Sequence, residues 1–406
     1  MKTLSNEQKS NRVNRFFNVI ENAMNKVFAA MPKEINHLSL LLFCVTALLL
    51  VGSVMVASAS MPYAATSTPN GNELYFFTRH LAYLFVASIF AAIAYFIPTR
   101  YWFDKLHVMM FIASFTLLFA VLFVGKEVNG SSRWIEIAGV TFQPSELAKF
   151  AMIAIAADFV VTNADAIRVS VTNLLRLCVS VGIIVGLIGT QDLGAAIVVF
   201  ISVAVIIFLA GIPFLASASI LGLALSVVVI GVLLTPWRLE RVLSFLDPWS
   251  DRHGTGYQLT QSLMAFGRGE WTGVGLGQSV QKLAYLPEAH TDFMLAISAE
   301  ELGFFGVFSI FALSFLLVAC CMRIGMVALR NNHLRAGYLC YGIASIFLFQ
   351  TCVNAGMNMG LLPVKGLTLP FISYGGSSLV VCAVMIAVVV RIAKTTSTPN
   401  INDSKT

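Results

Sequence analysis

Charged residues are scarce in this sequence, and their scarcity sets the class of protein. Of the 406 residues only 11% are charged and 58% are hydrophobic, and the mean hydropathy is +0.82. A soluble domain carries about a quarter charged residues, so most of this chain must face lipid or lie buried in a helical bundle. The net charge of +6 is too small and too dispersed to indicate nucleic-acid binding. The composition predicts an integral membrane protein.

Other familiar features are missing as well. The seven cysteines lie in apolar stretches without metal-ligand spacing, which argues against a disulfide framework and favours small core residues. Residues 1–37 are too long and too polar to begin a cleaved signal peptide, so we expect a cytoplasmic tail. The sequence has no internal repeat, which weakens the case for a transporter built from two equivalent halves.

Long apolar runs recur along the chain. A spanning helix needs about 20 predominantly apolar residues, and ten runs qualify. They begin near Leu38, His80, Leu106, Leu147, Leu174, Leu193, Phe214, Phe293, Ala336 and Gly376. We therefore expect an all-α integral membrane fold, with a ten-helix domain over residues 38–394 between the N-terminal tail and a cytoplasmic C-terminal tail, residues 395–406.

The distribution of Lys and Arg predicts the orientation. These residues are concentrated in the N-terminal tail, in the even-numbered loops and after the last helix, whereas the odd-numbered loops are mixed in sign. By the positive-inside rule both termini lie in the cytoplasm. Two polar loops then fall on the outer face: a large one between the seventh and eighth helices, about residues 236–289, and residues 361–373. Such loops are where membrane enzymes and transporters keep their working residues.

The segment 285–293 at the end of the large loop combines acidic groups with a membrane boundary. His290 and Asp292 stand directly before an apolar run, where partial desolvation disfavours a charged carboxylate and raises its pKa towards that of a working base. Alternatively, Thr291 or Asp292 caps the following helix. The residues alone leave catalysis and capping open.

Further charged residues lie nearby on the expected outer face. Glu300 and Glu301 fall two turns into the apolar run, which is costly unless they are paired. The cations available for pairing, or for holding a phosphate, are Arg133, Arg241 and Lys365.

Several of these stretches together resemble the signature of the SEDS family (shape, elongation, division and sporulation). The matching residues are Gly256–Gln258, Gln261–Ser262, Gly275–Gly277, Gln281–Lys282, Leu286–Phe293, Gly360, Pro363, Lys365–Gly366, Pro370–Phe371 and Ser373–Ser378. With ten expected spans the resemblance covers almost the whole chain. The long N-terminal tail is similar to that of the cell-division members.

The resemblance implies a peptidoglycan glycosyltransferase that polymerises lipid II in the bacterial inner membrane, at the division septum. The family's essential aspartate falls on Asp292, the expected general base, with Glu288 and His290 tuning or orienting it. Lys365, Arg133, Arg241, Gln261 and Ser377 are the residues expected to bind substrate or pyrophosphate. No cofactor is certain; a divalent cation, Mg²⁺ or Mn²⁺, with Asp292 as a ligand is left open.

The resemblance also implies partners: a class B penicillin-binding protein transpeptidase and single-span division regulators, besides lipid II and membrane lipid. Two other functions remain open. A lipid II flippase would need charges near the bilayer midplane, whereas the polar motifs here gather on the outer face. A scaffold that only recruits division proteins leaves the Asp292 region unexplained.

Overall fold

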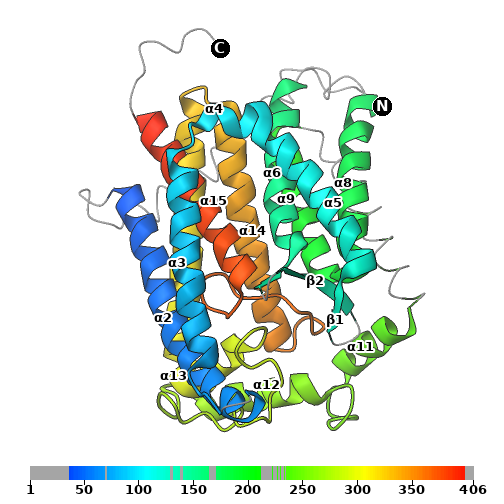
Figure 1. Cartoon of the computed structure of the whole chain (residues 1–406), viewed down its shortest axis with the longest axis vertical. Coiled ribbons are helices and arrows are strands. Elements are labelled where there is room, and N and C mark those ends of the chain that lie inside the picture. The colour runs from blue at the N-terminus through cyan, green and yellow to red at the C-terminus, as the bar shows by residue number, and fades with distance from the viewer. Residues whose placement is uncertain are drawn as a thin grey trace, which may run out of the picture.

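A computed structural model describes residues 36–68, 71–128, 131–137, 140–163, 171–211 and 235–397, and four isolated positions between 222 and 233. Helices dominate this part of the chain (Figure 1). In chain order the elements are α2 (His37–Ser67), α3 (Tyr75–Phe96), α4 (Thr99–Tyr101), the π-helical turn η1 (Trp102–Leu106), α5 (His107–Val124), β1 (Lys126–Val128), β2 (Ser131–Ile137), β3 (Val140–Phe142), α6 (Pro144–Thr162), α8 (Val171–Gln191), α9 (Leu193–Leu209), α11 (Pro236–Leu246), α12 (Tyr257–Gly269), α13 (Met294–Arg330), α14 (Leu334–Asn358) and α15 (Gly376–Ser397).

The chain is a multi-pass helical membrane protein. Six of the described helical segments are long and apolar enough to cross a bilayer: His37–Ser67, Tyr75–Phe96, Thr99–Val124, Met294–Arg330, Leu334–Asn358 and Gly376–Thr396. Each predicted helix start other than Phe214 lies within five residues of an observed one. The helix expected from Phe214 lies mostly outside the described residues, as do both predicted tails apart from their innermost residues.

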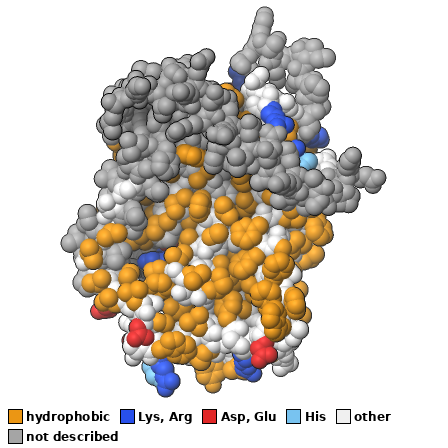
Figure 2. Space-filling view, turned by 180° about the vertical axis from the view of Figure 1, so that it is seen from behind, with side chains coloured by type: hydrophobic (Ala, Val, Ile, Leu, Met, Phe, Trp, Pro, Cys, Tyr) orange, Lys and Arg blue, Asp and Glu red, His pale blue; other side chains and the backbone are white. Residues whose placement is uncertain are grey.

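The helices run in one general direction, and the loops gather at its two ends. In Figure 1, α2 begins and α15 ends near the upper end, where α4 also lies, while β1, β2, α11 and α12 lie at the lower end. In Figure 2 hydrophobic side chains cover the middle of the described surface, and most charged side chains lie towards its ends. Of the six spans α14 is the most buried and α3 the least.

A small sheet, which hydropathy does not predict, stands between α5 and α6. Its strand order is β1-β2-β3, and both pairings are antiparallel. Ile135 of β2 pairs with Phe142 of β3, and Glu136 with Thr141. The sheet places β2 beside the ends of α5, α6 and α8, at the same end of the molecule as the large loop.

Helix α13 is broken at Gly303, whose φ of 66° and ψ of −165° are not helical. The loop after α12 makes the hydrogen bonds that the break leaves open. Val274 N and Gly275 N donate to the carbonyl oxygens of Glu300 (2.9 Å) and Glu301 (3.1 Å). A Cβ atom at Gly303 would lie 2.3 Å from the backbone nitrogen of Gly273, so a side chain would push the two segments apart.

Candidate active site

Asp292 lies in the last turn of the large loop, two residues before α13 begins. The N-cap position of α13 is Phe293, and no side chain caps the helix, so the capping alternative is wrong for Asp292 and Thr291. The backbone oxygen of Asp292 accepts hydrogen bonds from the side-chain amides of Asn354 (3.0 Å) and Asn358 (3.1 Å) on α14. The Asp292 main chain is therefore fixed by the two asparagines, and the Asp292 carboxylate takes no part in these bonds.

The two asparagines were not singled out from the sequence. Both are fully buried and stand one turn apart on an apolar helix, a spacing that puts them on the same face. Asn358 also accepts from Ala296 N (3.2 Å), and Asn354 donates to the Leu367 carbonyl oxygen. They join the start of α13 to the loop before α15. Buried amides at helical spacing were the available signal, because such groups must find partners.

The surroundings of Asp292 raise the pKa of its carboxyl to about 8 from a usual 3.8. Burial contributes most, and the negative charge of Glu288 adds to it; Arg133 acts in the opposite direction, and Asp192 raises the pKa further. An acid with such a pKa can take up a proton near neutral pH, which is the property of a general base.

Arg133 is brought to Asp292 by the small sheet. Its Nε donates to the Gln191 carbonyl oxygen (2.8 Å), and its Nη1 lies 3.8 Å from Asp192 Oδ2. A Cβ atom built on Gly366 would lie 2.7 Å from Arg133 Nη1 and 3.1 Å from Asp292 Oδ2. The guanidinium and the carboxylate thus face the same small space, which stays open because Gly366 has no side chain.

The other predicted cations are placed differently. Lys365 is half-buried and directly precedes Gly366, so the structure brings its backbone to Asp292 and Arg133. The side chain of Arg241, on α11, lies outside the described residues, and its proposed role stays a prediction.

Glu288 and His290 lie in the same turn but contact different groups: Glu288 contacts a hydroxyl, and His290 contacts aromatic rings. Glu288 has a φ of 56°, and its Oε2 accepts from Thr291 Oγ1 (2.7 Å), which leaves its charge close to Asp292. The His290 ring packs with the rings of Tyr63, Phe76 and Tyr374, at centroid distances of 5.4, 4.8 and 5.6 Å. Burial lowers the pKa of His290, so the ring is neutral at pH 7 and anchors the turn among aromatic rings.

Gln261 and Ser377 lie on different helices, α12 and α15. Gln261 is half-buried on α12, which is fastened to α14 by a hydrogen bond from Ser262 Oγ to the Asn358 carbonyl oxygen (2.7 Å). Ser377, at the start of α15, accepts from Gln143 N (3.1 Å) and donates to the Thr141 carbonyl oxygen (3.4 Å). Their contacts fasten the surrounding loops, and their proposed binding of substrate stays a prediction.

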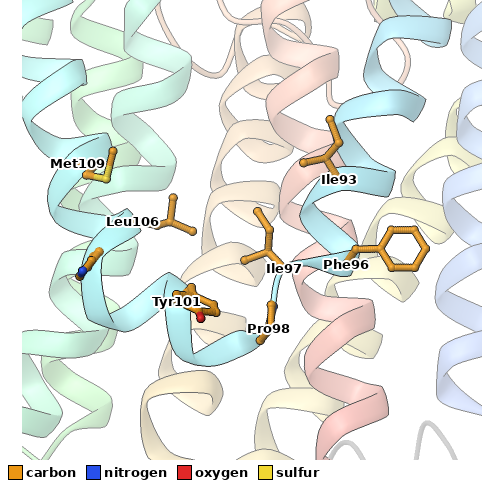
Figure 3. Close-up of a pocket in the computed structure, with 8 residues that line it drawn as sticks. Ile93, Phe96, Ile97, Pro98, Tyr101, Leu106 and Met109 are labelled. Carbon is orange, nitrogen blue, oxygen red and sulfur yellow. The ribbon is translucent and has the colours of Figure 1, made fainter.

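Ser377 also lies at one end of a long apolar cavity of about 780 Å³. Arg79, Thr141 and Ser377 line one end, and Ile97, Trp102 and Leu106 line the other. The walls come from α3, η1, α5, β3, α6 and α15. A second hollow of about 670 Å³ shares Ile93, Ile97 and Leu106 with it; Figure 3 shows Ile93 and Ile97 of the α3 end opposite Leu106 and Met109.

Glu300 and Glu301 are paired, as their burial required. Glu301 accepts from Lys282 Nζ (2.7 Å) and from Ser58 Oγ (2.7 Å). Glu300 contacts Arg268 Nη1 (3.2 Å) and accepts from Ser279 Oγ and from two backbone amides of the loop. These pairs fasten the loop that carries Asp292 to α13 and α2.

Another buried ion pair lies in α6. Lys149 Nζ contacts Glu146 (2.8 Å) and Gln350 Oε1 (2.8 Å), and Gln350 in turn donates to the Thr368 carbonyl oxygen (2.9 Å). Both charged groups are almost fully buried. The pair joins α6 and α14 to the loop that contains Gly366.

The described ranges hold no group of three or more His, Cys, Asp or Glu side chains placed to bind a metal ion together. Magnesium often binds through one or two carboxylates and substrate phosphates, and Asp292 is a half-buried carboxylate that suits this arrangement. The divalent cation stays a prediction.

The fold and the site define a multi-pass membrane protein with a candidate catalytic centre at one membrane surface. A family model described as cell cycle protein, which unites FtsW, RodA and SpoVE, matches residues 38–398. The chain therefore belongs to this family, the SEDS family, as its motifs indicated.

Individual relatives agree with this assignment. The probable peptidoglycan glycosyltransferase FtsW of Acinetobacter baylyi is 51% identical over 371 residues, covering 91% of this chain and 92% of that protein. The protein of the same name from Aliivibrio salmonicida is 41% identical over 367 residues, covering 90% and 91%.

Solved structures share the fold. A chain from a peptidoglycan synthase complex, described as coordinating polymerization and crosslinking, aligns with a TM-score of 0.71 at 30% identity. The crystal structure of the rod shape determining protein RodA from Thermus thermophilus aligns with a TM-score of 0.63 at 28% identity. Each alignment covers 88% of this chain and 97% of the other.

Proposed function

We propose that this protein is a peptidoglycan glycosyltransferase that polymerises lipid II into glycan strands for the septal wall. The observation that carries the proposal is the Asp292 carboxyl, with its pKa raised to about 8, facing the same space as the anchored Arg133. The relatives at 51% and 41% identity bear the name of this activity.

In the proposed reaction Asp292 is the general base. The free 4-hydroxyl of an incoming N-acetylglucosamine attacks the anomeric carbon of a lipid-linked chain, and Asp292 takes the hydroxyl proton as the new bond forms. The bond from the anomeric carbon to the pyrophosphate oxygen breaks, and undecaprenyl pyrophosphate leaves. One displacement inverts the configuration, so no covalent enzyme intermediate is required.

The leaving pyrophosphate gains negative charge as this bond breaks. Arg133 can stabilise it, because a guanidinium binds phosphate oxygens in pairs and keeps its charge when partly buried. Lys365, next to Gly366 on the neighbouring loop, is the second cation of the proposal. A Mg²⁺ or Mn²⁺ ion bound by Asp292 and the phosphates would neutralise charge at the same place.

The apolar cavity suits the lipid part of such a substrate. Its Ser377 end is lined by Thr141 of β3, the strand paired with β2, and β2 carries Arg133. A phosphate at Arg133 would therefore have an apolar channel beside it. Hydrophobic walls and a few polar groups at one end are the usual features of a lipid-binding site.

The proposal includes the arrangement in the membrane. In the proposed arrangement the chain crosses the membrane ten times, both termini lie in the cytoplasm, and the Asp292 site lies on the outer face, where the sugars of lipid II would be polymerised. A class B penicillin-binding protein is the proposed partner, since a solved chain with this fold belongs to a synthase complex.

A lipid II flippase is the alternative activity. The buried Lys149–Glu146 pair is the feature that a translocation path would use, but its members contact each other and Gln350. A group held in this way does not line an open path. The enzyme is therefore the better supported function.

Polymerisation of labelled lipid II by the purified protein with its transpeptidase tests the proposal. In detergent the wild type should form glycan strands, and Asp292→Ala should form none. A flippase needs a sealed membrane, so activity in detergent separates the two functions. The matched control is Asp247→Ala, an exposed aspartate at the end of α11, which should polymerise like the wild type. Polymerisation by Asp292→Ala would refute Asp292 as the base, and an inactive wild type would refute the enzyme.

A further inference from the structure

The turn between α8 and α9 is a rigid corner. Asp192 is 1% exposed, and its Oδ1 caps α9 by accepting from Gly194 N (2.9 Å) and Ala195 N (3.2 Å). The neighbouring Gln191 donates from Nε2 to the Leu118 carbonyl oxygen on α5 (3.1 Å). Three helices therefore fix the position of two residues that the sequence analysis did not single out.

The turn between α8 and α9 offers two hydrogen-bond acceptors to the Arg133 side chain. Asp192 Oδ2 is buried without a hydrogen-bond partner among the described residues, and Arg133 Nη1 lies 3.8 Å away. The Gln191 carbonyl oxygen accepts from Arg133 Nε at 2.8 Å. One oxygen of Asp192 thus serves the helix, and the other faces the guanidinium.

We propose that Asp192 is a positioning residue that holds Arg133 where it can stabilise the leaving pyrophosphate. The inference rests on the proposed function. Asp192 and Asp292 are both carboxylates within reach of Arg133, and a buried carboxylate attracts a guanidinium strongly. Held by the corner, the guanidinium faces the space in front of Gly366. Released from Asp192, it would pair with Asp292, which would occupy the base and withdraw the cation from the phosphate.

The variant Asp192→Asn isolates the charge from the helix cap. The asparagine Oδ1 can still accept from Gly194 N and Ala195 N, so α9 keeps its start. The atom that faces Arg133 changes from a charged carboxylate oxygen to an uncharged amide NH2 group, which cannot hold the guanidinium. The matched control is Asp158→Asn, which removes a carboxylate that contacts Arg335 (2.9 Å) but does not contact the site.

Steady-state polymerisation of lipid II gives the first readout. We expect kcat to fall about 100-fold in Asp192→Asn, as when one charge-stabilising donor is lost from a transition state. KM should change little, because Arg133 acts mainly on the charge that develops as the bond breaks. The double variant Asp192→Asn/Arg133→Gln should be no slower than Arg133→Gln alone. Unchanged kcat in Asp192→Asn, or losses that multiply in the double variant, would overturn the proposal.

Chemical rescue gives a readout that a structural role would not affect. Guanidinium ions at millimolar concentration should restore part of the activity of Arg133→Ala, because the Gln191 carbonyl and the Asp192 carboxylate remain to hold them. The same ions should not restore Arg133→Ala/Asp192→Asn. Equal rescue in both backgrounds, or none with Asp192 intact, contradicts the positioning role.

An inactive wild type, or an active Asp292→Ala, contradicts the proposed function itself. An active wild type with an inactive Asp292→Ala, but a fully active Asp192→Asn, contradicts only the positioning of Arg133. Should Asp192→Asn not accumulate, the rescue of Arg133→Ala still tests whether the corner holds a guanidinium.

Discussion

Replacing Asp292 by asparagine should make the protein more stable and inactive at the same time. The folded state raises the pKa of this carboxyl to about 8 from 3.8, mainly because burial disfavours the charged form. Asparagine has the same shape without the charge. The change therefore removes the cost of holding a carboxylate in the folded site.

The sign follows from proton binding. A carboxyl with a raised pKa in the folded state holds a proton that the unfolded state has lost, so it contributes stability at low pH. That contribution is complete below about pH 4 and is lost as the pH rises through about 8. At pH 4 the variant and the wild type should be equally stable. As the pH rises, the free energy of unfolding of the wild type should fall relative to that of the variant.

The magnitude follows from the size of the shift. Each pKa unit corresponds to about 1.4 kcal/mol, so the full shift corresponds to about 6 kcal/mol. The Asp292 side chain is only half-buried by its exposed surface, and water screens part of the effect. We expect a gain of about 3 kcal/mol at pH 9.

Unfolding of the detergent-solubilised protein, measured at intervals from pH 4 to pH 9, checks this expectation. Glu240→Gln, on the exposed face of α11, is the matched control and should follow the wild type. A gain for Asp292→Asn that is equal at pH 4 and pH 9 would indicate a packing effect and refute the reasoning. A loss of stability at pH 9 would show that the carboxylate is held by favourable contacts.

Three further outcomes follow from the contacts of the site. The polymerisation rate should rise with pH through about 8, because Asp292 must lose its proton to act as a base; a rate that is flat from pH 6 to 9 argues against this role. Lys282→Met leaves the buried Glu301 without its cation and should lower the free energy of unfolding by about 3–5 kcal/mol. Adding Glu301→Gln to Lys282→Met should recover most of the lost free energy of unfolding. The Arg268 side chain is 47% exposed, so Arg268→Met should lower the free energy of unfolding by about 1 kcal/mol or less. Equal losses for Lys282→Met and Arg268→Met would show that burial of the cation does not decide the cost. Gly366→Ala places a methyl group 2.7 Å from the Arg133 guanidinium and should slow polymerisation about 100-fold with unchanged thermal stability. If the variant had wild-type activity instead, the space between Arg133 and Asp292 would have to widen to accept the methyl group.

Hydropathy predicted the helices well because a segment that crosses lipid must be apolar. A segment in the bilayer must be apolar and must satisfy its own backbone, so the starts near Leu38, Leu193 and Gly376 agree with the structure to within one residue. The position of Asp292 at the start of an apolar run also followed from the sequence. So did the need of Glu300 and Glu301 for partners, since an unpaired buried charge is costly.

What the sequence did not reveal depends on contacts between distant segments. Asp192 stands where a helix would begin, and nothing local indicates that its second oxygen faces Arg133, 59 positions earlier. Asn354 and Asn358 bind the Asp292 backbone across a separation of more than 60 residues. The small sheet was missed because its strands of three to seven residues are too short to show an alternating pattern. His290 appeared as a polar group near the base, and only the fold shows its ring among Tyr63, Phe76 and Tyr374.

The break in α13 at Gly303 has a practical consequence for anyone who labels this protein. Residues 270–275 complete the hydrogen bonding of α13, so a tag or a fluorophore sequence inserted there would separate the two halves of a spanning helix. The turn at residues 247–255 is exposed and largely self-contained, with Asp251 accepting from Thr255 N (2.7 Å) and Thr255 Oγ1 (3.0 Å). An epitope placed in that turn should leave the site intact and report on which side of the membrane the large loop lies.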